Sequence, residues 1–201
     1  MKKTIFNEKT VRLFVALVPD GEVLKRLAPL VRRLKQEHWA GDVRWLPEEN
    51  IHLTLRFLGE THERQYLCLK TILTQNLART SGFELTLTNI MFLPSASKTR
   101  VVAVGVSPCS HLKKLVADVE NSAVQCGFDG EKRRFKGHIT LGRCRDLNMK
   151  KQEALTDFRG VSIPVRYVEI VKSTLSETGS FYGSMDRIML LTEPANQGTQ
   201  A

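Results

Sequence analysis

Short apolar segments alternate with longer amphipathic ones along this chain of 201 residues. The first apolar segment, VRLFVALV at residues 11–18, is closed by Pro19-Asp20-Gly21 and is typical of a buried strand followed by a break. Further strands are predicted at residues 42–46, 51–58, 83–92, 100–106, 161–171 and 187–191. Apolar residues at helical spacing predict helices at residues 20–37, 63–79 and 110–127.

These elements fall into two comparable halves, each with strands, a helix of about five turns and one strand carrying the phrase His-apolar-Thr-Leu. We expect an α+β fold of two pseudo-symmetric lobes of antiparallel sheet, with helices on the outer faces and a cleft between the lobes. Residues 1–192 are predicted to form this single bilobal domain. Residues 193–201 lack apolar periodicity and are predicted to be a disordered tail.

The repeated phrase occurs in IHLTLRFLG at residues 51–59 and in FKGHITLGR at residues 135–143. Because strand side chains alternate between faces, His52 and Thr54 share one face, and His138 and Thr140 share one face of the second strand. The intervening aliphatic residues point to the opposite, buried face. If the lobes are related by a two-fold axis, two imidazoles and two hydroxyls converge on one centre.

Two facing histidines are suited to metal-free displacement at phosphorus. A neutral imidazole takes a proton from water while a protonated one gives a proton to the leaving oxygen. Hydroxyl groups and an arginine can bind the non-bridging oxygens. A single histidine on a strand is more often structural, but two copies of the phrase favour catalysis. Zinc is the rival interpretation, and the phrase lacks thiolate or carboxylate ligands at useful spacing.

The net charge of +9 favours a polyanionic partner such as nucleic acid, although a basic surface can also serve solubility alone. The cysteines form no C-x-x-C pair and lie beside no histidine at metal-ligand spacing; they are Cys68, Cys109, Cys126 and Cys144. No export signal and no membrane-spanning stretch is apparent in the sequence. We therefore expect a reduced, cytoplasmic monomer that needs no metal or other cofactor.

The motifs and their flanks resemble the two-histidine phosphoesterase superfamily, in particular its RNA 2′,3′-cyclic phosphodiesterase branch, also called 2′-5′ RNA ligase or LigT-like. The resemblance covers RLFVAL, VRWLPEENIHLTLRFLGE, FELTL, RVVAVGV and FKGHITLGR. It implies hydrolysis of the 2′,3′-cyclic phosphate at RNA ends or on nucleotides, to the 2′-phosphomonoester. By motif position, the resemblance implies that His52 is the proton donor and His138 the proton acceptor. It assigns phosphate binding to Thr54, Thr140 and Arg143.

Two features depart from the family pattern. Gly137 stands where the family usually has proline before the second histidine. Strict alternation also puts Arg143 on the aliphatic face, from which it reaches the site only if the strand ends or twists near Gly142. By the same counting Arg56 lies on the histidine face and is a rival phosphate ligand.

Several alternatives stay open from the sequence alone. The same residues could serve the reverse reaction, 2′-5′ ligation of RNA ends, and a non-catalytic RNA-binding module is a third possibility. The basic residues 132–136 could guide an RNA backbone or form a solvated loop. Tyr182 is a candidate cleft residue that could stack on a base, as are Phe57 and Phe135, although such aromatics are more often part of the core.

Overall fold

The computed structural model describes residues 10–150, 158–176 and 179–191. The strands are β1 (Val11–Leu17), β2 (Arg44–Trp45), β3 (Leu53–Thr61), β4 (Phe83–Ser95), β5 (Lys98–Val106), β6 (His138–Leu147), β7 (Ser162–Val165), β8 (Tyr167–Ser176) and β9 (Gly179–Met189). The helices are α1 (Gly21–Leu34), α2 (Glu63–Leu77) and α3 (Ser110–Gln125), with short 3-10 helices η1 (Ala40–Asp42) and η2 (Glu48–Asn50).

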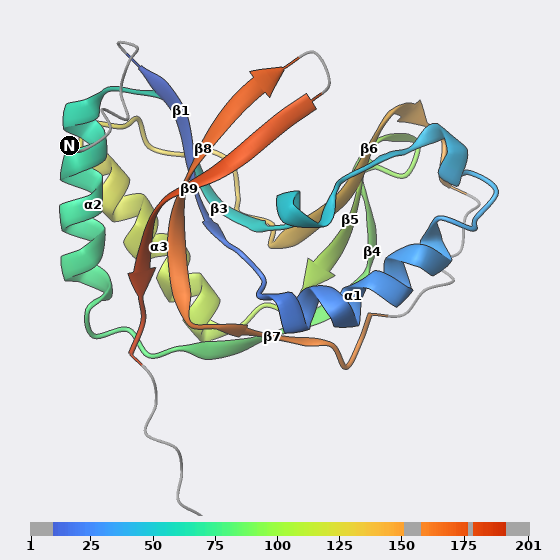
Figure 1. The fold of residues 1–201 in the computed structure, drawn as a ribbon, viewed down its shortest axis with the longest axis horizontal. Helices are drawn as coiled ribbons and strands as arrows, with labels where there is room; N and C mark the ends of the chain where they lie inside the picture. Colours follow the sequence, from blue (N-terminus) through green and yellow to red (C-terminus); the bar gives the residue numbers. More distant parts are fainter. Residues whose placement is uncertain (1–9, 151–157, 177–178, 192–201) are drawn as a thin grey trace, which may run out of the picture.

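The described strands form one curved antiparallel sheet in the order β7-β4-β5-β6-β3-β1-β8-β9, with β2 added beside β6 (Figure 1). The two motif strands, β3 and β6, are neighbours at its centre. Their register pairs a single residue of each strand, Leu53 with Ile139. On either side of this pair the strands diverge, which separates the sheet into two halves as the predicted lobes require.

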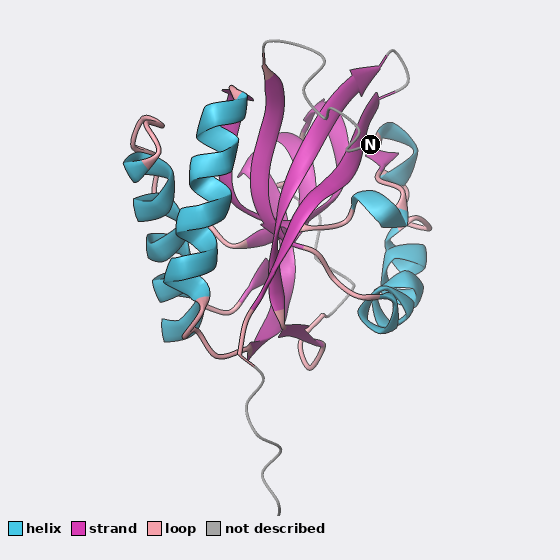
Figure 2. Cartoon of the chain, turned by 60° about the vertical axis from the view of Figure 1, so that its left-hand side comes forward, coloured by secondary structure: helices cyan, strands magenta, loops and turns pink. Residues whose placement is uncertain are grey.

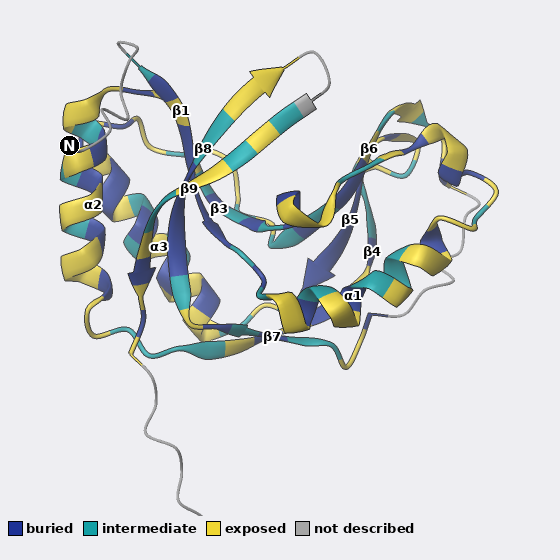
Figure 3. Ribbon diagram, viewed as in Figure 1, coloured by how far each residue is buried: buried dark blue, intermediate teal, exposed yellow. Residues whose placement is uncertain are grey.

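The helices cover these halves unequally. Helices α2 and α3 lie side by side against the half that contains β1, β3, β8 and β9, whereas α1 lies near β4 and β5 (Figures 1 and 2). Asp20 caps α1 by accepting the Val23 N–H at 3.0 Å, and Pro29 lies inside a helix that continues to Leu34. Buried positions concentrate on the sheet and on the inner helix faces (Figure 3). No helix among the described residues is long and apolar enough to cross a membrane.

The α+β fold with antiparallel strands and the three helices are confirmed, and the helix ends lie within three residues of those predicted. The single strand predicted at residues 161–171 is wrong. The chain instead makes two strands around Arg166, with β7 pairing β4 and β8 pairing β1. The hairpin-like segment expected at residues 131–136 contains no strand. The predicted tail at 193–201 lies outside the described residues.

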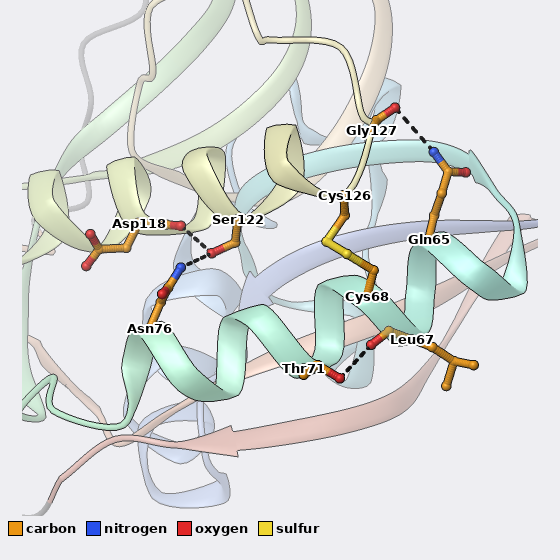
Figure 4. The surroundings of a disulfide bond; sticks show 9 residues. All are labelled: Gln65, Leu67, Cys68, Thr71, Asn76, Asp118, Ser122, Cys126 and Gly127. Carbon is orange, nitrogen blue, oxygen red and sulfur yellow. Dashed lines mark hydrogen bonds between the residues drawn. A yellow bond between two sulfur atoms is a disulfide. The ribbon is translucent and has the colours of Figure 1, made fainter.

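A disulfide joins Cys68 of α2 to Cys126 at the end of α3 (Figure 4). The expectation that all cysteines are reduced is therefore wrong for this pair, while Cys109 and Cys144 are free. The two half-cystines are 58 positions apart in the sequence, so spacings of a few residues could not reveal the pair. A hydrogen bond of 2.9 Å from Asn76 to Ser122 makes a second link between the helices.

We expect two of the four cysteines to react with a thiol reagent in denaturant without reductant, and four after reduction. Opening the crosslink removes a constraint on the unfolded chain, so reduction should lower the free energy of unfolding by up to about 4 kcal/mol. Urea unfolding with and without reductant measures this difference. Cys109→Ser should lower the first thiol count by one and keep the effect of reductant. Four reactive thiols without reductant would contradict the disulfide.

Candidate active site

The register at the centre of the sheet brings the two motifs together. In an antiparallel pair that matches Leu53 with Ile139, His52 falls opposite Thr140, and His138 falls opposite Thr54. Leu53 and Ile139 are each 1% exposed, so their side chains lie in the core and the motif side chains lie on the other face. The two histidines are then diagonal neighbours, close enough for the charge of His138 to contribute to lowering the pKa of His52. The register thus places the four predicted side chains on one face of the same sheet.

Both imidazoles are held by the same hydrogen bond. Nδ1 of His52 lies 2.8 Å from the carbonyl oxygen of Asn50, and Nδ1 of His138 lies 2.7 Å from that of Lys136. A carbonyl oxygen only accepts, so Nδ1 must carry the proton in each ring. The neutral form of each histidine therefore has its lone pair on Nε2, and the charged form carries an acidic proton there. Each ring can act as a base or an acid through Nε2.

The surroundings of His52 lower its pKa. The centroid of its ring lies 4.8 Å from that of Phe14 and 5.2 Å from that of Tyr182, which meets it edge-on. Its Nε2 lies 3.1 Å from the Thr54 hydroxyl. Desolvation by this burial is the main cause of the lowered pKa, and the positive charges of Arg143 and His138 act in the same direction. The bond to Asn50 opposes them. The free site therefore favours neutral His52.

A β-bulge decides where Arg143 lies. In the β5–β6 ladder Ala103 pairs with Thr140 and Val102 with Gly142, so Leu141 is an extra residue. This insertion reverses the alternation that the sequence pattern assumed and brings Arg143 to the face of His138 and Thr140. Arg143 is exposed, and its effect on the pKa of His52 shows that its charge reaches the site.

A second bulge in β3 has the opposite consequence for Arg56. Val15 pairs with Arg56 and Ala16 with Thr54, which leaves Leu55 extra. Arg56 is therefore turned to the face of α3, where its Nε lies 2.7 Å from Glu120, and its Nη1 lies 3.7 Å from Glu131. The expectation that Arg56 rivals Arg143 as a phosphate ligand is wrong. Phe57, 57% exposed, takes the position in β3 that Arg143 takes in β6.

Two pockets lie beside His52 and the residues that contact it. One of about 250 Å³ is lined by Arg143, Arg44, Asn50 and the hairpin residues Ser180 to Tyr182, among others. The other, of about 200 Å³, is lined by His52, Phe14, Tyr182, Glu169 and Arg187, among others. Tyr182 lies between the two pockets because it lines both.

Sequence reasoning missed two residues that complete the site. Arg44 of β2 pairs directly with Arg143 and lines the same pocket, so two positive charges face that pocket. Asn50, 8% exposed, accepts the His52 ring proton through its carbonyl and donates its side-chain amide to the Ser180 carbonyl at 3.0 Å. Their only signal was position, since VRWLPEEN directly precedes the first motif.

The basic residues 132–136 are exposed except for Phe135. Arg133 pairs with Glu131 at 2.8 Å and lowers the pKa of that carboxyl to about 2. The role of this segment in binding RNA stays a prediction. Among the described residues, no group of three or more His, Cys, Asp and Glu side chains is arranged to hold a metal ion.

Comparison with known proteins assigns the family. The model of the 2′-5′ RNA ligase superfamily matches residues 23–175, which is well over half of the chain. The chain belongs to this superfamily. The match includes both motifs, Arg44 and Arg143.

Similar proteins cover most of the chain. An RNA 2′,3′-cyclic phosphodiesterase of Thermotoga maritima is 29% identical over 86% of this chain and 91% of its own length. A protein of the same name from Archaeoglobus fulgidus is 27% identical over 86% of this chain and 96% of its own. The apo structure of E. coli LigT superposes with a TM-score of 0.76 at 26% identity and covers 91% of this chain and 99% of its own.

Gly142 is needed for the position of Arg143. A Cβ atom at residue 142 would lie 2.4 Å from Cγ1 of Val43 and 3.3 Å from the Arg44 carbonyl oxygen, so Gly142→Ala must displace β2. If Arg143 binds phosphate, we expect KM for a cyclic phosphate to rise at least about tenfold, as for the loss of a hydrogen bond to a charged group. Gly41→Ala is the control, because a Cβ there meets nothing within 4 Å. Equal kinetics in the two variants would contradict this dependence.

We expect His52 to titrate below the value of an unperturbed histidine, about 6.5, and Arg143→Gln to raise its pKa. The sign follows because Arg143 disfavours the protonated ring, so removal of its charge makes protonation easier. Histidine titration by NMR measures both values. Arg145→Gln removes the same charge farther along β6 and should have a smaller effect. An unchanged pKa of His52 in Arg143→Gln would show that the two groups do not interact.

Proposed function

We propose that the protein is an RNA 2′,3′-cyclic phosphodiesterase that opens the cyclic phosphate to a 2′-phosphomonoester by paired-histidine acid–base catalysis, without a metal. The observation that carries the proposal is the register of β3 and β6, which sets His52 and His138 on one face with Nε2 as the reactive nitrogen of each ring.

The proposed reaction is a displacement at phosphorus. Neutral His138 takes a proton from water at Nε2 as the water oxygen attacks the phosphorus atom. The bond from phosphorus to the 3′ oxygen breaks, and protonated His52 gives its Nε2 proton to that oxygen. The 2′ ester bond remains, and the rings return to their starting protonation states by exchange with solvent. The diagonal placement of the rings leaves room for phosphorus between them.

The non-bridging oxygens need partners because negative charge concentrates on them in the transition state. The Thr54 hydroxyl lies 3.1 Å from Nε2 of His52, and the register places Thr140 opposite His52, so both hydroxyls lie on the face of the histidines. Arg143 adds the positive charge. Tyr182 contributes to the binding surface beside His52.

The negative charge of the bound phosphate favours the acid role of His52. Burial and nearby positive charges lower its pKa in the free site, whereas an anion beside Nε2 raises it. Substrate binding thus promotes the protonation state that the reaction needs. Because acid and base titrate as a coupled pair, the rate should depend on pH as a bell, and each apparent pKa belongs to the pair.

The relatives support this choice of substrate. The curated relatives from T. maritima and A. fulgidus carry the name RNA 2′,3′-cyclic phosphodiesterase. A structure of E. coli LigT in complex with 3′-AMP superposes on this chain with a TM-score of 0.75 at 26% identity, covering 90% of this chain and 98% of its own. Hydrolysis is favoured over ligation in water, because water greatly exceeds any 5′-hydroxyl acceptor. A cytoplasmic, monomeric protein stays a prediction.

The decisive experiment is turnover of nucleoside 2′,3′-cyclic phosphates in excess EDTA, with the product isomer identified. We expect the 2′-monophosphate at a rate that EDTA does not change. His52→Ala and His138→Ala should each lower kcat by roughly 10²- to 10⁴-fold, the usual contribution of a general acid or base.

His38→Ala is the matched control, since His38 is exposed and belongs to neither motif. Its kcat should equal that of the wild type. A folded wild-type protein that binds RNA but turns over neither mononucleotides nor short RNA would favour the binding-module alternative. Loss of activity in EDTA that returns with a divalent metal would contradict the metal-free mechanism.

A further inference from the structure

We propose that the pocket beside His52 binds the nucleobase of the substrate and that Glu169 accepts hydrogen bonds from the N–H groups on the edge of that base. The pocket then prefers guanine. This inference rests on the proposed function, because it extends the same site to the rest of the nucleotide. The pocket lies over β1, β8 and β9, on the side of His52 away from β6.

A buried carboxylate paired with an exposed arginine lines this pocket. Glu169 of β8 is 3% exposed, and its Oε1 accepts two hydrogen bonds from Arg187 of β9, from Nε at 3.0 Å and from Nη2 at 2.7 Å. The Arg187 guanidinium also lies 4.1 Å above the ring of Tyr167. Removing a carboxylate from water carries a large desolvation cost, which a paired charge and well-formed hydrogen bonds offset. The pair is thus a built feature of the site rather than a chance contact on the surface.

One atom of each partner remains available for a ligand. Within the described residues, Glu169 Oε2 accepts no hydrogen bond and Arg187 Nη1 donates none. The pocket therefore offers an acceptor and a donor close together. The fold of the sheet does not need either atom, since Glu169 already pairs with Ala16 and Arg187 through the backbone.

The walls of the pocket suit a flat apolar ring. Phe14, Val171 and Tyr182 form a small apolar cluster on this face, separate from the main core. The volume of about 200 Å³ lies below the roughly 300–1,000 Å³ of pockets that enclose drug-sized ligands. One base with part of its ribose matches this size better than a whole nucleotide.

The spacing from the histidines also fits a nucleoside. Glu169 lies on β8, two strands from β3, which His52 directly precedes, since β1 runs between β3 and β8. Neighbouring strands lie roughly 4.8 Å apart, so the separation across the sheet is about 10 Å. In a nucleotide, the ribose together with the width of the base separates the phosphorus atom from the Watson–Crick edge by a distance of this order. Because Arg187 neutralises Glu169, the carboxylate adds little repulsion toward the phosphate.

Guanine matches the two free atoms best. Its Watson–Crick edge presents N1–H and the exocyclic N2–H beside the O6 carbonyl. The N–H groups can donate to the Glu169 carboxylate, and O6 can accept from Arg187. Adenine and cytosine each present one amino group beside a ring nitrogen, and uracil presents one N–H between two carbonyls. A carboxylate acceptor therefore gains most from guanine.

The test compares kcat/KM for the four nucleoside 2′,3′-cyclic phosphates, each divided by kcat/KM for methyl riboside 2,3-cyclic phosphate, which has no base. In the wild type we expect the highest ratio for guanosine, by at least roughly fivefold over adenosine and cytidine. Glu169→Gln should reduce the guanosine ratio by a similar factor. Asp186→Asn is the matched control, because the neighbouring carboxylate Asp186 lies toward α2, 2.6 Å from Lys70. It should leave all four ratios unchanged.

The outcomes separate this inference from the proposed function. Failure to hydrolyse any of the five compounds would overturn the proposed function. Turnover of methyl riboside cyclic phosphate with equal kcat/KM ratios for all four bases would overturn only the recognition of the base by Glu169. A wild-type preference for adenosine or cytidine, or ratios in Glu169→Gln that match the control, would also overturn it. If Glu169→Gln does not fold, competitive inhibition of the wild type by the four nucleoside 2′-monophosphates tests the same ranking.

Discussion

The pairing of Leu53 with Ile139 is the constraint on which the site depends. It is the residue pair through which β3 and β6 meet, and it fixes which side chains face each other across the centre of the sheet. A slip of one residue would turn the histidines and threonines of one strand into the core and its leucines out to the cleft. Burial of the two aliphatic side chains, each 1% exposed, opposes such a slip, so the same apolar contact that stabilises the sheet also sets the catalytic register.

The two bulges break the symmetry of this centre. Each motif gains an extra residue directly after its threonine, Leu55 in β3 and Leu141 in β6. The third residue after each threonine then faces the cleft, and these residues differ: Phe57 in one strand and Arg143 in the other. A symmetric backbone thus carries an asymmetric surface, with positive charge on the β6 side and aromatic rings on the β1–β3 side. This asymmetry suits a substrate with a charged phosphate on one side and a base on the other.

Much of this arrangement could be predicted from residues close together in the sequence. Period-two alternation in IHLTL and HITL predicted which side chains share a face, and helical spacing together with Asp20 predicted the helices. The positions of Arg143 and Arg56 could not be predicted, because a bulge depends on the neighbouring strand. The Glu169–Arg187 pair and the Cys68–Cys126 disulfide also depend on tertiary contacts. Within the single strand predicted at residues 161–171, the alternation of apolar and polar residues gave no sign that the chain forms two strands, β7 and β8, on either side of Arg166.

The electrostatics of the site follow from where it lies in the sheet. The ring of His52 contacts Phe14 and Tyr182, which exclude water from it, and the positive charge of Arg143 also acts on it. Both effects disfavour a charged imidazole, so protonation of His52 is unfavourable until an anion binds. A cyclic phosphate brings that anion and is also the group to be cleaved. The protonation that the leaving oxygen requires is therefore coupled to substrate binding, and the aromatic residues that impose this coupling form a wall of the pocket beside the phosphate position.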